Sequence, residues 1–153
     1  MAHCLGVAFV DADSEIEKAA GCEIASIFKT YGEAAFREGE KKVICRLLEN
    51  KPHILATGGG AFMNEATRNA VKEHATSVWL DAKIPVLVER VSRKKTRPLL
   101  ANGDPAEILT KLAKERNPIY AEADIRVESG DGAHEEVVRA VLEALKQHWA
   151  PGS

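Results

Sequence analysis

The stretch His53-Ile-Leu-Ala-Thr-Gly-Gly-Gly60 joins a short apolar run to three consecutive glycines, and a helix-like segment over 64–74 follows it. The run over 53–57 is typical of a strand covered on both faces of a parallel sheet. Three glycines remove every Cβ from the loop, so backbone N–H groups can approach an anion or a hydroxyl closely. The alternative is a plain tight turn, which needs only one or two glycines.

Similar apolar runs lie on both sides of this stretch, over 7–10, 77–80 and 125–127. The segment between the first two strands is long and helical: it opens on a capping box, Ser14 to Glu17, has breaks at Gly21 and Gly32, and stops before Pro52. Further helices are expected over 85–92, from Asp104-Pro105 to about Asn117-Pro118, and over 134–148. This alternation predicts one α/β domain over 1–153 with a frayed tail at 149–153.

The composition excludes several classes of protein. The 153 residues carry 21 Lys and Arg against 23 Asp and Glu, a net charge of −2, which argues against a general nucleic-acid binder. No apolar run is long enough for a membrane span, and the N-terminus does not resemble a signal peptide. Three cysteines without CxxC or Cys/His spacing predict reduced thiols, and no zinc site, in a cytoplasmic protein.

Two carboxylates, Asp11 and Asp13, follow the first apolar run in the sequence Phe-Val-Asp-Ala-Asp. Ligands of open α/β sheets bind at the carboxyl ends of strands, and a strand continuing through both residues would point them the same way. Such a pair can hold Mg²⁺ or accept a substrate hydroxyl. The alternative is that Asp13 merely begins the next helix near Ser14.

A basic stretch contains Arg90, Arg93, Lys94, Lys95 and Arg97 and leads into a loop with proline and glycine. These cations are placed to close on phosphate groups as a mobile lid over about 93–104. A solvated helix face is the usual alternative for a charge run, and a nucleic-acid patch would lack aromatic partners here.

Together these pieces resemble shikimate kinase, a small P-loop kinase family of aromatic amino-acid biosynthesis. Six segments carry the resemblance in order. They are Phe-Val-Asp-Ala-Asp (9–13), Ile-Phe (27–28), Gly-Glu-Ala-Ala-Phe-Arg-Glu-Gly-Glu (32–40), Ala-Thr-Gly-Gly-Gly (56–60), Arg-Pro-Leu-Leu (97–100) and Glu-Arg-Asn-Pro-Ile-Tyr (115–120). The resemblance implies a three-layer parallel sheet of the nucleoside-monophosphate-kinase type. It also implies a monomer that transfers phosphate from ATP, with Mg²⁺, to the shikimate 3-hydroxyl.

The resemblance also assigns roles to individual residues. Shikimate would contact Asp13, Arg37, Gly59 and Arg116, where two guanidinium groups suit its carboxylate and Asp13 is the candidate base. Gly58 and Gly60 complete the loop, and Glu40 supports Arg37. Phe28, Phe36 and Pro98 would form the apolar walls. Arg97 would reach the ATP phosphates and stabilise charge on the transferred group, and Asp11 would lie near Mg²⁺.

One element of the family pattern does not occur. Family members begin with a strand and a Walker A loop, GxxxxGK[ST], and the 153 residues contain no Gly-Lys pair. We therefore expect a P-loop kinase fold whose first strand and P-loop are missing through N-terminal truncation, with little or no kinase activity. The alternatives are a non-catalytic shikimate-binding remnant or partner-binding pseudo-kinase, and a related kinase such as gluconate kinase.

Overall fold

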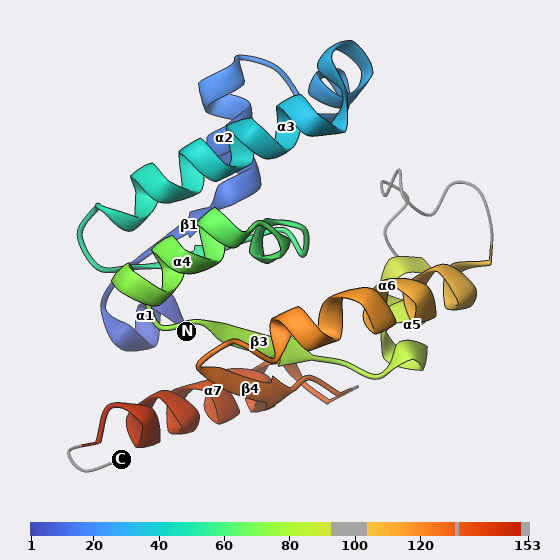
Figure 1. Ribbon diagram of the computed structural model, residues 1–153. Coiled ribbons are helices and arrows are strands. Elements are labelled where there is room, and N and C mark those ends of the chain that lie inside the picture. The colour runs from blue at the N-terminus through green and yellow to red at the C-terminus, as the bar shows by residue number, and fades with distance from the viewer. Residues whose placement is uncertain (93–103, 131, 151–153) are drawn as a thin grey trace. The chain divides into compact units, whose positions relative to one another are not determined.

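The structure is a computed structural model that describes residues 1–92, 104–130 and 132–150. It divides into two compact units, Met1–Thr76 and Ser77–Ser153. Each unit contains two strands that pair in parallel, with helices between them in sequence (Figure 1). This alternation is the predicted α/β arrangement.

The first unit is built on strands β1 (Ala8–Asp11) and β2 (His53–Ala56). Their register pairs Ala8 with His53 and Asp11 with Ala56, so the carboxyl ends of both strands meet at one edge. Between them run α2 (Ala12–Ala20) and α3 (Ile24–Leu48). The unit also contains α1 (Ala2–Leu5), the short 3₁₀ helix η1 (Ala61–Met63) and α4 (Glu65–His74), and both α2 and α4 pack on α3 (Figure 1).

Glycines set the helix boundaries between β1 and β2, as the sequence predicts. Gly21 ends α2 in the left-handed conformation, with φ 68°. Gly32 bends α3 internally, with φ 80° and ψ 174°, a region that is essentially restricted to glycine. The two halves of α3 thereby change direction while the helix keeps covering the core.

The core of the first unit lies between α2, α3 and the two strands. Its main cluster holds Ile16, Ile27, Phe36, Val43 and Leu47, and Leu55 of β2 packs against them. A second cluster joins Ala12, Ile44 and Ala61, and Ile44 is fully buried. Phe36, Val43, Ile44 and Leu47 recur at helical spacing along α3 and are all buried. One face of this part of the helix is therefore apolar and packs into the core.

The capping box predicted over Ser14 to Glu17 is wrong. The strand ends at Asp11, whose Oδ1 accepts a hydrogen bond from the Ser14 backbone N–H at 3.1 Å, so Asp11 is the N-cap of α2. Glu17 instead accepts from the Ile24 N–H at 2.9 Å and supports the start of α3. The helix therefore begins at Ala12, and Asp11 and Asp13 do not share one face of a strand.

The second unit contains β3 (Val78–Asp81) and β4 (Ile125–Glu128), in register from Val78 with Ile125 to Asp81 with Glu128. Its helices are α5 (Ile84–Ser92), α6 (Pro105–Tyr120) and α7 (His134–His148). Helix α7 packs on β4 and buries Val141 and Leu145. None of the described helices combines the length and apolar character that crossing a membrane requires.

Helix α6 begins as predicted, with Asp104 accepting from the Ala106 N–H at 3.0 Å and Pro105 in the first turn. It does not stop at Asn117-Pro118 but continues to Tyr120. Pro118 lies in the last turn of α6, and its missing N–H removes one hydrogen bond of the helix. The loss is tolerated there because the carbonyls of a helix end lack partners within the helix in any case. The Ala121 N–H donates to the Asn117 carbonyl at 2.9 Å and closes the helix.

Candidate functional site

The three glycines lie at the carboxyl ends of the paired strands of the first unit. Gly58, Gly59 and Gly60 follow β2 and lead into η1, as predicted for a loop between a strand and a helix. The Arg68 guanidinium of α4 donates to the carbonyls of Phe62 and Met63, at 3.1 and 2.9 Å, and fixes the turn after the loop. The loop is thus held between a strand and an anchored turn.

Arg37 is held on α3 by two carboxylates. Its Nη1 donates to Glu40 Oε2 at 2.7 Å, and its Nη2 contacts Glu33 Oε1 at 3.3 Å. The Glu40 residue is only 3% exposed, so the stronger of these contacts is shielded from water. Glu40 therefore supports Arg37, as the resemblance implied.

Glu33 is a member of this cluster that the sequence interpretation missed. It precedes Arg37 by four residues, which places the two side chains on the same helix surface. The spacing Glu-Ala-Ala-Phe-Arg carried that signal in the sequence.

The glycine loop lies against this cluster. A Cβ placed on Gly60 would overlap the Arg37 guanidinium. A Cβ on Gly58 would lie 3.6 Å from Asp13 Oδ1 and 3.7 Å from Glu40 Oε1. The structure therefore brings together five predicted residues from α2, α3 and the loop: Asp13, Arg37, Glu40, Gly58 and Gly60.

Burial and the charges of neighbouring groups both shift the pKa values of Glu40 and Arg37. Burial raises the pKa of Glu40, and the nearby charges of Asp13 and Glu33 add to this, although Arg37 opposes it. Burial alone would lower the pKa of Arg37, but the hydrogen bonds and charges of Glu40 and Glu33 raise the pKa above its usual value. Arg37 is thus a permanent cation whose geometry is fixed, which suits the recognition of a carboxylate.

Phe36 lies beside Arg37 and packs against Phe28, and both residues were predicted as apolar walls. The rings of Phe28 and Phe36 have centroids 4.6 Å apart, and the Arg37 guanidinium carbon lies 5.1 Å from the Phe36 centroid. Phe36 is 5% exposed, so it is part of the core and also supports the cation. An apolar ring face would meet aromatic carbon here.

Asp11 lies at the carboxyl end of β1, where its carboxylate caps α2. Among the residues that the structure describes, no group of three or more His, Cys, Asp or Glu side chains could hold a metal ion. Mg²⁺ binds through one or two carboxylates when substrate phosphates supply the other oxygens, so a single Asp11 fits that mode and does not fit an all-protein site.

Gly59 lies in the same loop, and the remaining predicted residues belong to the second unit or to the part of the chain that is not described. Arg116 is a half-buried residue of α6 and belongs to the second unit. Arg97, Pro98 and most of the predicted lid lie outside the described residues, and Asp104 at its end caps α6. Arg90 does not belong to a lid: its Nη2 donates to Ser129 Oγ at 3.0 Å and to the Gly130 carbonyl at 2.8 Å.

Comparison with known proteins gives one consistent result. The family model described as shikimate kinase matches residues 1–146. A shikimate kinase of Caulobacter vibrioides is 54% identical over 150 residues, which cover 98% of this chain and 75% of that protein. A shikimate kinase of Paramagnetospirillum magneticum is 52% identical over 145 residues, covering 95% of this chain and 74% of that protein.

Two solved structures resemble this chain along nearly its full length. Shikimate kinase from Acinetobacter baumannii in complex with shikimate gives a TM-score of 0.91 at 35% identity, over 97% of this chain and 83% of that one. The structure from Aquifex aeolicus gives 0.82 at 34% identity, over 99% of this chain and 87% of that one. The fold expected from the sequence, the α/β fold of nucleoside-monophosphate kinases, is therefore confirmed.

Proposed function

The chain belongs to the shikimate kinase family, a family of phosphotransferases, and we propose that its first unit binds shikimate at the cluster of Asp13, Arg37, Glu40 and the glycine loop. The observation that carries this proposal is the approach of Arg37 and Asp13 to Gly58 and Gly60. The related Acinetobacter baumannii enzyme is in complex with shikimate in its solved structure, which supports the same ligand here.

The chemistry of the cluster fits a cyclic hydroxy acid. The fixed guanidinium of Arg37 pairs with the ligand carboxylate, and Arg116 is the second cation that the family pattern implies. Asp13 accepts a hydrogen bond from a ring hydroxyl, and Gly59 of the same loop offers its backbone at close range. Phe28 and Phe36, with Pro98, provide apolar contact for the ring.

The family reaction is transfer of the ATP γ-phosphoryl group to the shikimate 3-hydroxyl, giving ADP and 3-phosphoshikimate. In this assignment Asp13 removes the proton of the attacking hydroxyl, and Arg97 stabilises charge on the transferred group. Mg²⁺, held through ATP phosphates with Asp11 nearby, would neutralise phosphate charge. Positioning and charge stabilisation dominate such transfers.

We expect the 153-residue chain to bind shikimate more readily than it turns shikimate over. It contains no GxxxxGK[ST] segment, which supplies the phosphate cradle, its lysine and a Mg²⁺-binding hydroxyl in P-loop kinases. One cationic group in such a site is worth about 10³–10⁵ in rate. A purely shikimate-binding chain is accordingly the second candidate function.

A thermal-shift comparison of shikimate with gluconate, followed by a coupled ADP-release assay, tests these assignments on the same preparation. The proposal predicts that shikimate raises the melting temperature, that gluconate does not, and that ADP release is absent or far below the rate of a family member. Stabilisation by gluconate alone would identify a different substrate class. Turnover of shikimate at the rate of a family member would contradict the expected lack of activity.

A further inference from the structure

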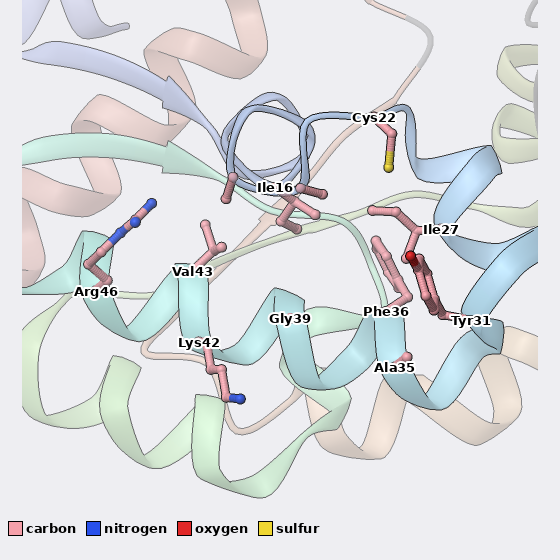
Figure 2. Close-up of a pocket in the computed structure, with 12 residues that line it drawn as sticks. Ile16, Cys22, Ile27, Tyr31, Ala35, Phe36, Gly39, Lys42, Val43 and Arg46 are labelled. Atoms are coloured by element: carbon pink, nitrogen blue, oxygen red, sulfur yellow. The ribbon is translucent and has the colours of Figure 1, made fainter.

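A second hollow in the first unit has no role in the proposed reaction. It is a groove of about 570 Å³ between α2 and α3, within the size range of small-molecule sites. Its lining is mostly apolar, with Ile16 from α2 and Ile27, Phe36 and Val43 from α3 (Figure 2). The Ile16 side chain faces the side of α3 from which Val43 and Phe36 project (Figure 2). Apart from Phe36, the lining shares no residue with the cluster around Arg37.

Gly39 keeps the middle of this groove open. It lies inside α3 with helical backbone and no positive φ, so its conformation does not require glycine. A Cβ at this position would meet nothing within 4 Å, so close packing does not require glycine either. Glycine in a helix interior is less favourable than alanine, because it loses more conformational freedom on folding. The free space beside Gly39 is the feature that a larger side chain would remove.

One end of the groove carries the cation of Arg46. This residue lines the groove and makes no ion pair or hydrogen bond through its side chain among the residues the structure describes. Its side chain extends to the same side of α3 as Val43 (Figure 2). Lys42, one turn earlier, also lines the groove, but its Nζ lies 3.7 Å from Glu38 Oε1, and this carboxylate offsets its charge. Arg46 is therefore the cation of the lining that has no carboxylate partner among the described residues.

We propose that this groove binds an elongated apolar molecule with one anionic head group, of the class of medium-chain carboxylic acids. The carboxylate pairs with Arg46, and the alkyl chain lies along α3 past Gly39 towards Phe36. Ala35, at the far side of the lining, precedes Arg46 by about 16 Å of helix, which suits an extended chain. The anionic head group complements the charge of Arg46, and the alkyl chain complements the apolar lining along the rest of the groove. The proposal does not rest on the proposed kinase function.

Calorimetric titration of the 153-residue chain with decanoate, below its micelle-forming concentration, tests the proposal. We expect saturable binding of one molecule per chain and much weaker binding of decan-1-ol, which lacks the charge. Arg46→Gln should weaken decanoate binding about tenfold, the loss of one charge-assisted hydrogen bond. Lys41→Gln, the matched control on the same helix, should leave affinity within about twofold because Lys41 does not line the groove.

Filling the groove provides an independent readout. Gly39→Leu should abolish decanoate binding and preserve the helical circular dichroism, since the new side chain enters open space. Arg46 is exposed, so its variant remains informative even if Gly39→Leu fails to fold. Absence of saturable binding, binding of many molecules per chain, or equal effects of Arg46→Gln and Lys41→Gln would overturn the proposal. Concentration-dependent dimerisation that Gly39→Leu abolishes would assign the groove to a second copy of the chain instead.

Discussion

Residue by residue, the site depends on how Arg37 is held. Glu40 accepts from it at 2.7 Å beneath the surface, Glu33 contacts it from the same helix, and the Phe36 ring lies beside it. Gly60 leaves the room that the guanidinium occupies. A cation fixed in this way loses little conformational freedom when it pairs with a ligand carboxylate.

The buried carboxyl of Glu40 predicts a specific pH dependence of stability. Its pKa in the folded chain is raised above 4.5, chiefly by burial, so the protonated form favours the folded state. The free energy of unfolding of the wild type, relative to Glu40→Gln, should therefore be highest below pH 4.5 and should fall as pH rises through the raised pKa. Urea unfolding of both proteins across this pH range measures the difference.

Glu38 on the same helix is the control for this effect. A hydrogen bond from Lys41 lowers its pKa, so the stability it contributes is present above its unfolded pKa and is lost as pH falls. The pH dependence relative to Glu38→Gln should have the opposite sign and be small, because the side chain is half exposed. The same sign for Glu40 and Glu38 would contradict the assigned role of burial.

Gly60 and Gly58 differ in what a methyl group would meet. Gly60→Ala requires no backbone strain, since φ is −82° and ψ is −22°, but its Cβ would displace Arg37. We expect it to cost about 1–3 kcal/mol of stability and to weaken shikimate binding about tenfold or more. Gly58→Ala makes ordinary contacts and should change stability by less than about 0.5 kcal/mol.

Urea unfolding and shikimate titration of both glycine variants decide this point. Equal, small effects of the two substitutions on stability and shikimate binding would show that Arg37 moves aside at no cost. The close approach of Arg37 to Gly60 would then not contribute to shikimate binding.

At the scale of elements, sequence patterns located the helices and strands well because each pattern is local. The four strands, the helix over 134–148 and the breaks at Gly21 and Gly32 depend on apolar spacing and on glycine. The errors arose where two local signals compete. Ser14 and Asp11 both suit an N-cap, and the end of β1 decides for Asp11. Pro118 suits a stop, yet a helix tolerates it in its last turn.

The bend in α3 gives a paired test on one helix. Gly32→Ala places a side chain at φ 80° and ψ 174°, and should destabilise the chain by about 1–3 kcal/mol. Gly39→Ala lies in regular helix with open space around it, and should stabilise the chain by about 0.5–1 kcal/mol. Chemical unfolding midpoints measure both; a stabilising Gly32→Ala would mean that α3 does not need its bend.

For the whole molecule, the family and fold followed from six short segments taken in order, whereas the site followed only in part. Asp13, Arg37, Glu40, Gly58 and Gly60 meet because α2 and α3 fold back onto the loop of their own unit. The resemblance to the family, and not the spacing of these residues, predicted that they belong to one site. Arg116 belongs to the second unit, and a clamp formed with Arg37 depends on long-range placement that periodicity does not encode.

Each of the two compact units has one pair of parallel strands among its described residues. Strands of four residues carry apolar character in the sequence but no information about which strand lies beside them. Sequence reasoning could therefore establish strand positions and the parallel α/β class, but not how the paired strands are divided between units.

The most direct test of the account is a calorimetric titration of the folded 153-residue chain with shikimate, beside its Arg37→Gln and Arg46→Gln variants. We predict binding of one shikimate per chain, a loss of affinity of about tenfold or more in Arg37→Gln, and no change in Arg46→Gln, whose cation lines the groove between α2 and α3. No saturable binding to the folded chain, or equal affinity in Arg37→Gln and the wild type, would contradict the assignment of the shikimate site.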